Sequence, residues 1–593
     1  MTHLDWIILG VYFVVLLGVG LIPSRKGTGS TDEYFVGGRR LPWWIAGTSL
    51  IAASFASDTP LLVSGLVRSQ GVWGNWLWWG AGISAVLTVF LFAPLWRSAG
   101  VVTDAELTEL RYSGTTAAAL RGVKAIYWGL LFNLFVTGAW GMNGFVKVTG
   151  VVTGMDRDHA IWMCAAIGMA YAIVSGLWGL VLTDMLQFGM AIVGGLLLAW
   201  FALRDAGGLG PALDHVHPYQ LQILPTHGSG LDNALPFLLV FWWAWKNTDG
   251  SGVMVQRWAS CKDERHALGA TLWYCFVHYG LRSWPWILVG IASITLVPDS
   301  ALPLIGPTND LKPDHEAAYA VVLKQVLPAG LRGMVVAWFF AEFMGNVAQA
   351  MSWGGSLLVN DFYRRFVRRD ASSGHYMWVA RIAGLIVMGG AIGTAYLSTS
   401  IAGAFKVVLQ GTAAIGIVAA LRWLWWRMNA WSEIAAMVLS PLMTFVMSKW
   451  GKELLALLGA HPTDMNKTLA IVLGAGVPSV LISLLTEPED PLRLVAFYRR
   501  VRPPSFGWGP IARACPEVRS QVSLGQLGVR WAFGLAFVYG TMFAVGGFLL
   551  RQPIAGTIGL VAAVVGGAGV WITLSGRALP GSPAPAGAAP ADR

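Results

Sequence analysis

WWIAGTSLIAASFASDTPLLVSGL, residues 43–66, is the segment around which we expect the rest of the chain to be organised. It is long and apolar enough to cross a bilayer, which takes about 20 residues. Its middle reads ASDTP at 56–60, and a proline removes a backbone donor and disfavours helix in the residue before it. Asp58 also puts a carboxylate near the membrane centre, where a charge costs at least ~2.5 kcal/mol.

A helix break inside a membrane is tolerated only where the backbone lines protein or a watery cavity. The stretch therefore predicts a discontinuous helix with a binding site near the membrane midplane, as in secondary transporters. The structural alternative is a proline-kinked helix in which Asp58 is simply buried and hydrogen-bonded.

The composition excludes a soluble protein. Of the 593 residues, 55% are hydrophobic and only 12% are charged, whereas soluble domains carry about 25% charged residues. The net charge of +10 does not indicate nucleic-acid binding, because the basic residues cluster in short loops between apolar runs, as orientation signals do. The 4 cysteines are scattered without CxxC spacing, so we expect neither a disulfide framework nor a metal site.

The apolar runs of membrane length predict an all-α polytopic membrane protein with about 15 spans. They lie near 5–22, 43–66, 73–97, 121–150, 158–177, 180–203, 234–258, 270–296, 331–360, 378–398, 402–427, 431–450, 467–486, 529–550 and 554–575. The alternation of Lys and Arg between loops predicts insertion in the cell inner (plasma) membrane with the N-terminus outside and the C-terminus in the cytoplasm.

The largest cytoplasmic loop, 487–528, is basic, and we expect a solvated face near anionic lipid, with a regulator-binding site as the alternative. The tail from Ala578 is rich in Pro, Ala and Gly and is expected to be disordered.

A second interruption lies in the seventh span, which reads KNTDGSG at 246–252 between apolar residues. The glycines and charges predict a second unwound helix, five spans after the first, which suits two inverted five-helix repeats. Lys246 and Asp249 are three positions apart, so they could line a cavity or form a structural ion pair.

The ninth span places Trp338, Glu342, Asn346 and Gln349 along one helical face. A carboxylate inside a membrane is a functional candidate by default. The alternative is a protonated Glu342 that is hydrogen-bonded to a neighbouring helix.

Other polar residues within spans are weaker candidates. Arg282, or Lys406 beside Gln410, could be the counter-ion of Asp58 or Glu342. Tryptophans such as Trp245 flank the interruptions, where their faces suit a cationic ligand or a sugar ring as well as packing.

Several short stretches in order match a known family. They are STDEYF (30–35), GRRLPWW (38–44), SLIAA (49–53), Glu106-Leu107 with Arg111-Tyr112, the run 178–187, Gln256-Arg257 with Ala259 and Lys262, and NDFY (360–363). Through them the chain resembles the sodium:solute symporters, the family of the proline, pantothenate, sialic acid and glucose symporters, over about residues 5–450.

The resemblance implies a LeuT-type fold, a 5+5 inverted repeat with extra flanking helices. Its parts would be 1–42, the first span and a cytoplasmic loop, 43–203, the first repeat, 204–427, the second repeat, and 428–593, the peripheral spans, basic loop and tail.

The resemblance also implies a sodium site. Backbone carbonyls of Ala52 and Phe55 and the ninth-span residues Glu342, Gly345 and Asn346 would hold the ion. The family typically has a small residue and then paired hydroxyls at the last three positions, and this chain has no hydroxyl there.

Asp58 and Thr59 match positions that contact the solute in the family, and Asp184 matches an acid associated with the inward path of the ion. Asp184 lies in the first turns of its span, so helix capping is an equal alternative. The residues expected to contact the solute are Asp58, Thr59, Trp245, Lys246, Asp249, Trp338 and Gln410.

Together these features predict a transporter and not an enzyme: a cation-coupled symporter, with Na⁺ favoured, of a small polar organic solute. No cofactor other than the coupling ion and no nucleic-acid partner is expected. Two alternatives stay open, a proton-coupled transporter with Glu342 as the proton carrier and a membrane solute sensor that does not transport.

Overall fold

The computed structural model describes residues 1–21, 41–54, 56–101, 104–174, 177–224, 242–306, 310–520 and 523–575, and the single positions 238 and 240. Features expected elsewhere, such as those of Phe55 and of the tail from Ala578, lie outside this described part. The side chain of Asp184 also lies outside it, although helix α12 (Leu177–Asp205) runs through this position.

The regular elements of the N-terminal part of the chain are helices, apart from an isolated β-bridge between Leu41 and Cys261, in the residues described. After α1 (His3–Leu21) and the broken pair α3 (Trp43–Ala52) and α4 (Thr59–Ser69) come η3 (Val72–Asn75), α5 (Trp76–Trp79), α6 (Ala81–Phe90), α7 (Phe92–Ala99), α8 (Asp104–Arg111), α9 (Gly114–Ile126), η4 (Tyr127–Phe132), η5 (Phe135–Met142), α10 (Asn143–Thr153), α11 (Arg157–Val174), α12 and α13 (Leu209–Asp214).

The middle part begins at the second interruption and contains one small hairpin. Its helices are α15 (Trp242–Ala244), α16 (Val253–Ser260), α17 (Glu264–Cys275), η7 (Phe276–Leu281), α18 (Trp284–Leu296), η8 (Asp299–Ala301), η9 (His315–Ala317), α19 (Ala318–Val326), α20 (Leu331–Ser356), η10 (Leu357–Val367), α21 (Ser373–Leu397), α22 (Ile401–Gly411) and α23 (Ala413–Leu424). Strands β1 (Leu304–Ile305) and β2 (Lys312–Pro313) pair antiparallel.

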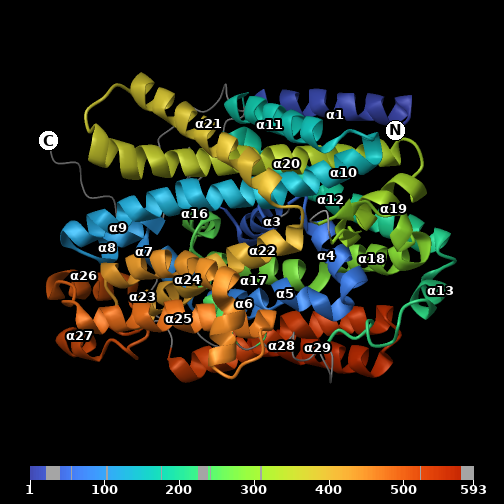
Figure 1. The fold of residues 1–593 in the computed structure, drawn as a ribbon. Coiled ribbons are helices and arrows are strands. Elements are labelled where there is room, and N and C mark those ends of the chain that lie inside the picture. The colour runs from blue at the N-terminus through green and yellow to red at the C-terminus, as the bar shows by residue number, and fades with distance from the viewer. Residues whose placement is uncertain are drawn as a thin grey trace.

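The C-terminal part adds α24 (Ala430–Leu457), α25 (Asp464–Leu485), α26 (Pro491–Val501), α27 (Gly509–Ala514), α28 (Leu524–Leu549) and α29 (Pro553–Ser575). Helices α28 and α29 pack along each other, and α28 also contacts α6 and η7. Figure 1 shows this pair along one side of the molecule, with α1, α20 and α21 along the opposite side.

Eight helices in the described residues are long and apolar enough to cross a membrane, or up to ten if each of two bent pairs is one span. The bent pairs are α6 with α7, at 52°, and α22 with α23, at 46°. The count of about 15 spans is therefore not confirmed. Part of the difference has a physical reason, because several expected spans are divided into shorter helices, such as α3 with α4 and α17 with η7 and α18.

The discontinuous helix predicted at residues 43–66 is confirmed. Helix α3 ends at Ala52 and α4 begins at Thr59, with Asp58 at its N-cap position. Pro60 lies in the first turn of α4. Backbone N–H groups there have no partner within the helix, so the N–H that proline lacks costs α4 no hydrogen bond. The proline therefore starts a helix here instead of kinking one.

The second predicted interruption is also confirmed. Helix α15 ends at Ala244, α16 begins at Val253, and the backbone between them is not helical. Gly250 and Gly252 have φ of 77° and 91°, a conformation that side chains with a Cβ rarely adopt. These two glycines let the chain turn between the short helices.

Packing places the two interrupted segments in one central group of helices. Helix α3 contacts α12, α16 and α17, and α4 contacts α18, α22 and η9. Figure 1 shows α3, α4, α16, α17 and α22 in the middle of the molecule. The side chains of both interruptions therefore meet other helices.

Candidate functional site

Asp58, at the first interruption, is buried and hydrogen-bonded. Its side chain is 1% exposed, and the indole N–H of Trp140 in η5 donates to its Oδ2. A Cβ placed on Gly144 would lie 2.6 Å from the Cα of Asp58, so only glycine allows α10 to approach this closely. These contacts fit both a solute-binding carboxylate and the structural alternative of a buried hydrogen-bonded acid. Thr59 follows directly as the first residue of α4.

The guanidinium of Arg282 satisfies a backbone carbonyl that the interruption leaves without a helical partner. Its Nη2 donates to the carbonyl oxygen of Ser54 at 3.1 Å, and its Nη1 lies 3.3 Å from the Ser54 Oγ. That hydroxyl also lies 3.0 Å from Nδ1 of His278. Arg282, expected as a counter-ion, thus bonds to the backbone at the interruption. His278 was not expected, because an isolated histidine in an apolar run has no pattern that assigns it a partner.

The polar side chains of the second interruption turn in different directions. Asn247 donates to the carbonyl of Ser251 at 2.6 Å, and the Thr248 hydroxyl donates to backbone carbonyls of the preceding turn. Asp249 Oδ2 lies 2.6 Å from Arg422 Nη2. The ion pair considered between Lys246 and Asp249 is therefore wrong, because the unwound backbone sends the two side chains apart.

The ammonium of Lys246 lies among aromatic rings. Its Nζ is 3.9 Å from the ring centre of Phe132 and 5.8 Å from the rings of Trp128 and Trp245. Such cation–π contacts stabilise a positive charge, typically by about 0.5–2 kcal/mol. Lys246 and these three aromatic residues are half-buried, so the group is not sealed from its surroundings.

A continuous series of aromatic contacts links the two interruptions. The ring of Trp245 stacks on Phe405 of α22, with 5.5 Å between centres and 14° between planes. Phe405 in turn meets the edge of Trp140, at 5.0 Å, and Trp140 donates to Asp58. A carboxylate from the first interruption and an ammonium from the second are thus joined through Trp140, Phe405 and Trp245.

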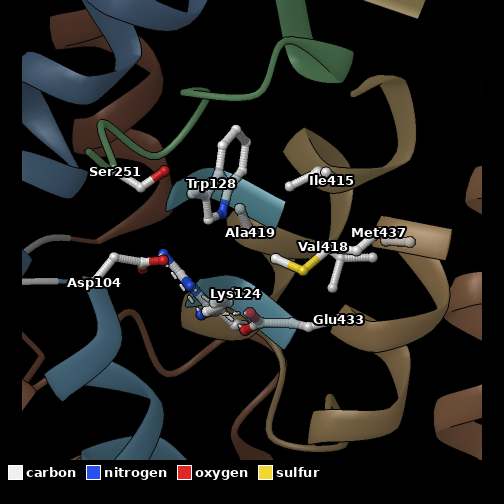
Figure 2. A pocket seen from close by; sticks show the side chains of 11 residues that line it. Asp104, Lys124, Trp128, Ser251, Ile415, Val418, Ala419, Glu433 and Met437 are labelled. Atoms are coloured by element: carbon white, nitrogen blue, oxygen red, sulfur yellow. Dashed lines mark hydrogen bonds and ion pairs between the residues drawn. The ribbon is translucent and has the colours of Figure 1, made fainter. Parts of the chain in front are cut away.

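A buried network of charged side chains contacts the second interruption through Asp249. Arg422 of α23 contacts Asp104 at 2.8 Å in addition to Asp249, and Lys124 of α9 contacts Glu433 of α24 at 2.7 Å. Lys124 Nζ also lies 3.3 Å from Asp104. Figure 2 shows Asp104, Lys124 and Glu433 pointing toward one another.

This network borders a small cavity, which is also lined by Trp128 and Ser251. Its volume of about 10 Å³ has room for a single water molecule. Except for Asp249, none of the charged residues of the network was expected from the sequence, because they come from segments far apart in the chain.

Apart from Phe55, which lies outside the described residues, the residues expected to hold the coupling ion lie on α3 and α20, and α12 contacts both helices. Ala52 ends α3, and Glu342, Gly345 and Asn346 share α20. Trp338 donates from its indole N–H to Glu342 Oε1 at 3.1 Å. A Cβ on Gly345 would lie 3.4 Å from the side-chain oxygen of Gln187 on α12.

Two further polar residues face a peripheral helix. Gln410 donates to the Thr468 hydroxyl at 2.9 Å, and Lys406 donates to Asp464 at 2.9 Å, both on α25. The hydrogen bond from Lys406 holds the pKa of the Asp464 carboxyl below its usual value. The described contacts of Lys406 and Gln410 are therefore with α25, not with Asp58 or Glu342.

A second charge cluster joins the segment between α18 and α19 to the central helices. Lys147 of α10 lies 2.7 Å from Asp314 and 2.5 Å from Glu316. The carboxylate of Glu316 also accepts the backbone N–H groups of Ile401 and Ala402, at 2.9 and 2.8 Å, and so caps α22. Burial raises the pKa of Asp314 despite the neighbouring lysine.

Comparisons of the sequence with known proteins match this chain to sodium-coupled solute transporters. A sequence profile of the "Sodium:solute symporter family" matches residues 34–439. The sodium/glucose cotransporter of Vibrio parahaemolyticus is 25% identical over 457 residues, 72% of this chain and 81% of the relative. Sodium/glucose cotransporter 1 of Sus scrofa is 25% identical over 425 residues, 65% of this chain and 62% of the relative.

A solved structure supports the fold. It is described as the substrate-bound outward-open state of a Na⁺-coupled sialic acid symporter, and it has a TM-score of 0.61 and 18% sequence identity. The match covers 82% of this chain and 99% of that one. At this identity the likeness concerns the fold alone.

Proposed function

Because the chain belongs to the sodium:solute symporter family, we propose that it carries a small polar organic solute across the membrane together with Na⁺. The family consists of multi-pass membrane transporters and not of enzymes. The cycle is alternating access, in which the helices around a central site open it to one side of the membrane at a time. Relatives named as sodium cotransporters support Na⁺ over the proton-coupled and sensor alternatives.

The solute site lies between the two helix interruptions. The observation that carries this proposal is the series of aromatic contacts from Asp58 through Trp140 and Phe405 to Trp245 and Lys246. Charged groups at both ends and aromatic faces between them suit a small solute with polar ends and a less polar body.

The remaining candidates have supporting places around this site. Thr59 borders it beside Asp58. Asp249 fixes the second interruption through Arg422, Trp338 orients Glu342, and Gln410 joins α22 to α25. These contacts favour positioning roles for the last three side chains over direct contact with the solute.

The coupling ion is held by the carbonyl oxygens of Ala52 and Phe55 and by Glu342, Gly345 and Asn346. Sodium prefers hard oxygen ligands, and a carboxylate, an amide oxygen and backbone carbonyls supply them. The carboxylate of Glu342 takes the place of the hydroxyls that the family typically uses. Asp184 lies on the inward path of the ion.

Two inverted repeats, 43–203 and 204–427, carry these sites, and each contains one of the interrupted helices. Residues 1–42 and 428–593 flank this core. The N-terminus lies outside, and the loop 487–528 and the C-terminus lie in the cytoplasm, as the distribution of Lys and Arg indicates.

Sodium-driven accumulation of a solute tests the proposal. Purified protein in proteoliposomes receives a mixture of small metabolites under an inward Na⁺ gradient at fixed pH, and mass spectrometry measures what accumulates. We expect accumulation that disappears when K⁺ replaces Na⁺. Accumulation driven by a proton gradient and indifferent to Na⁺, or none under either gradient, would contradict the proposal.

A further inference from the structure

We infer that Lys246 selects a solute with a carboxylate group and that the body of this solute packs on Trp245 and Phe405. The inference rests on the proposed function, because it takes the space between the two interruptions as the solute site. It adds the chemical class of the solute and the residue that recognises it.

Three polar side chains of the second interruption, those of Asn247, Thr248 and Asp249, bond to groups other than Lys246. Asn247 bonds to the Ser251 carbonyl, and the Thr248 hydroxyl bonds to the preceding turn. Asp249, three residues from Lys246, is taken by Arg422 at 2.6 Å and by the indole N–H of Trp423 at 2.8 Å. The backbone thus directs the natural counter-ion of Lys246 to another helix.

The described surroundings of the Lys246 ammonium are aromatic rings. Within the described residues no carboxylate lies within 4 Å of Lys246 Nζ, and its charged group faces the rings of Trp128, Phe132 and Trp245. Ring faces stabilise a cation less than a close anion does in a site of low dielectric constant. A positive charge kept without an acidic partner at the centre of a membrane protein is costly unless a ligand supplies that partner.

A carboxylate matches the single charge of Lys246 and its aromatic neighbours better than a phosphate or a neutral sugar does. One lysine neutralises one negative charge, and its ammonium lacks the planar fork with which a guanidinium forms the paired hydrogen bonds that favour phosphate groups. A neutral sugar would stack on the tryptophans but would leave the ammonium without a counter-charge. A small organic monocarboxylate supplies both the anion and a body that the aromatic faces can cover.

Matched pairs of probes test the inference while the natural solute is still unidentified. Purified protein in NaCl is heated with each member of a panel of small monocarboxylates without an amino group, including benzoate and pyruvate, and with the corresponding neutral amides. We expect at least one carboxylate to raise the unfolding temperature and its amide to have no effect. In Lys246→Gln this shift should disappear, whereas Lys246→Arg, which keeps the charge, should retain part of it.

The controls separate this inference from the proposed function. Lys449→Gln removes a lysine on the exposed surface of α24 and should leave the carboxylate shift unchanged. If amides stabilise as well as carboxylates, if no carboxylate stabilises, or if the shift survives in Lys246→Gln, the inference is overturned. Sodium-driven accumulation of a neutral solute by the unchanged protein, to the same extent in Lys246→Gln, would overturn it too, while leaving sodium-coupled symport intact.

Discussion

Asp249 and Arg422 hold the second helix interruption in place: Arg422 Nη2 lies 2.6 Å from Asp249 Oδ2, and the Asp249 side chain is fully buried. The same guanidinium contacts Asp104 on α8 and Glu433 on α24. One arginine therefore joins the non-helical backbone at the centre of the protein to three helices, α8, α24 and its own α23.

Removing this arginine should destabilise the protein strongly. Arg422→Met leaves Asp104, Asp249 and Glu433 buried with Lys124 as the remaining cation of the network, and loss of one partner of a buried pair costs about 3–5 kcal/mol. The measurement is the free energy of unfolding in detergent micelles. The control, Arg499→Met, breaks an exposed pair with Glu517 and should leave the free energy of unfolding nearly unchanged. Equal losses in the two variants would show that the network does not stabilise the fold.

Asp58→Asn should abolish solute uptake and leave the fold intact. The amide oxygen still accepts the hydrogen bond of Trp140, so the helix interruption keeps its contact, but the negative charge is gone. Uptake into proteoliposomes and the unfolding temperature, each with and without Na⁺, check both statements. A variant that folds poorly but still binds solute when purified would identify Asp58 as a structural residue, the alternative that its burial also fits.

Glu342→Gln should remove the stabilisation by Na⁺. The substitution keeps an acceptor for the Trp338 indole while deleting the charge proposed to hold the ion. We expect the rise in unfolding temperature between KCl and NaCl to disappear, along with sodium-driven uptake. Glu453→Gln, on the exposed surface of α24, serves as the control. A variant that responds to Na⁺ like the unchanged protein would exclude Glu342 from the ion site.

Lys147→Gln should be more harmful at neutral than at acidic pH. A raised pKa of Asp314 means that its contribution to stability is full below the unfolded pKa of about 4 and falls as the pH rises through the folded value. Without Lys147 this pKa rises further, so the loss of stability should be small near pH 4 and grow toward about pH 7. Unfolding temperatures across this range measure it, with Lys312→Gln, which breaks an exposed pair, as the comparison. A loss that does not vary with pH would contradict the mechanism.

Labelling of introduced cysteines should establish the orientation. The 4 native cysteines are all buried, so a membrane-impermeant thiol reagent should not reach them in the folded protein. Glu517→Cys, in the loop 487–528, should stay unlabelled in intact cells, and Lys312→Cys, on β2, should be labelled readily. Both positions are exposed, at 56% and 70%. The reverse pattern would invert the proposed topology.

The sequence predicts both helix interruptions because their causes are local. Pro60 and the pair Gly250 and Gly252 act on the backbone within a few residues, so their effect does not depend on the tertiary structure. The side-chain partners could not be predicted in this way. Arg422 meets Asp104 across more than half the chain, and Lys246 and Asp249 diverge because their spacing assumes a helix that the glycines prevent.

The number of membrane-spanning helices could not be predicted from the sequence either. Hydropathy identifies an apolar run, but it does not tell one straight helix from two short ones meeting at an angle, as in α22 and α23. Hydropathy also does not tell which face of such a helix meets which neighbour: Gln410 and Lys406 lie within an apolar run, yet their side chains contact α25.

The close approach of Gly144 to Asp58 makes the proposed solute site part of a closed ring of contacts. One helical turn beyond Gly144, Lys147 forms an ion pair with Glu316, and Glu316 accepts a backbone N–H from the first turn of α22. Helix α22 then returns through Phe405 to Trp140 and so to Asp58. A molecule that wedges between these aromatic rings would push on α22 at one point of this ring of contacts. The strain would be transmitted along α22 to its first turn, where Glu316 accepts two backbone N–H groups, so that binding between the rings and movement of this end of α22 would be coupled.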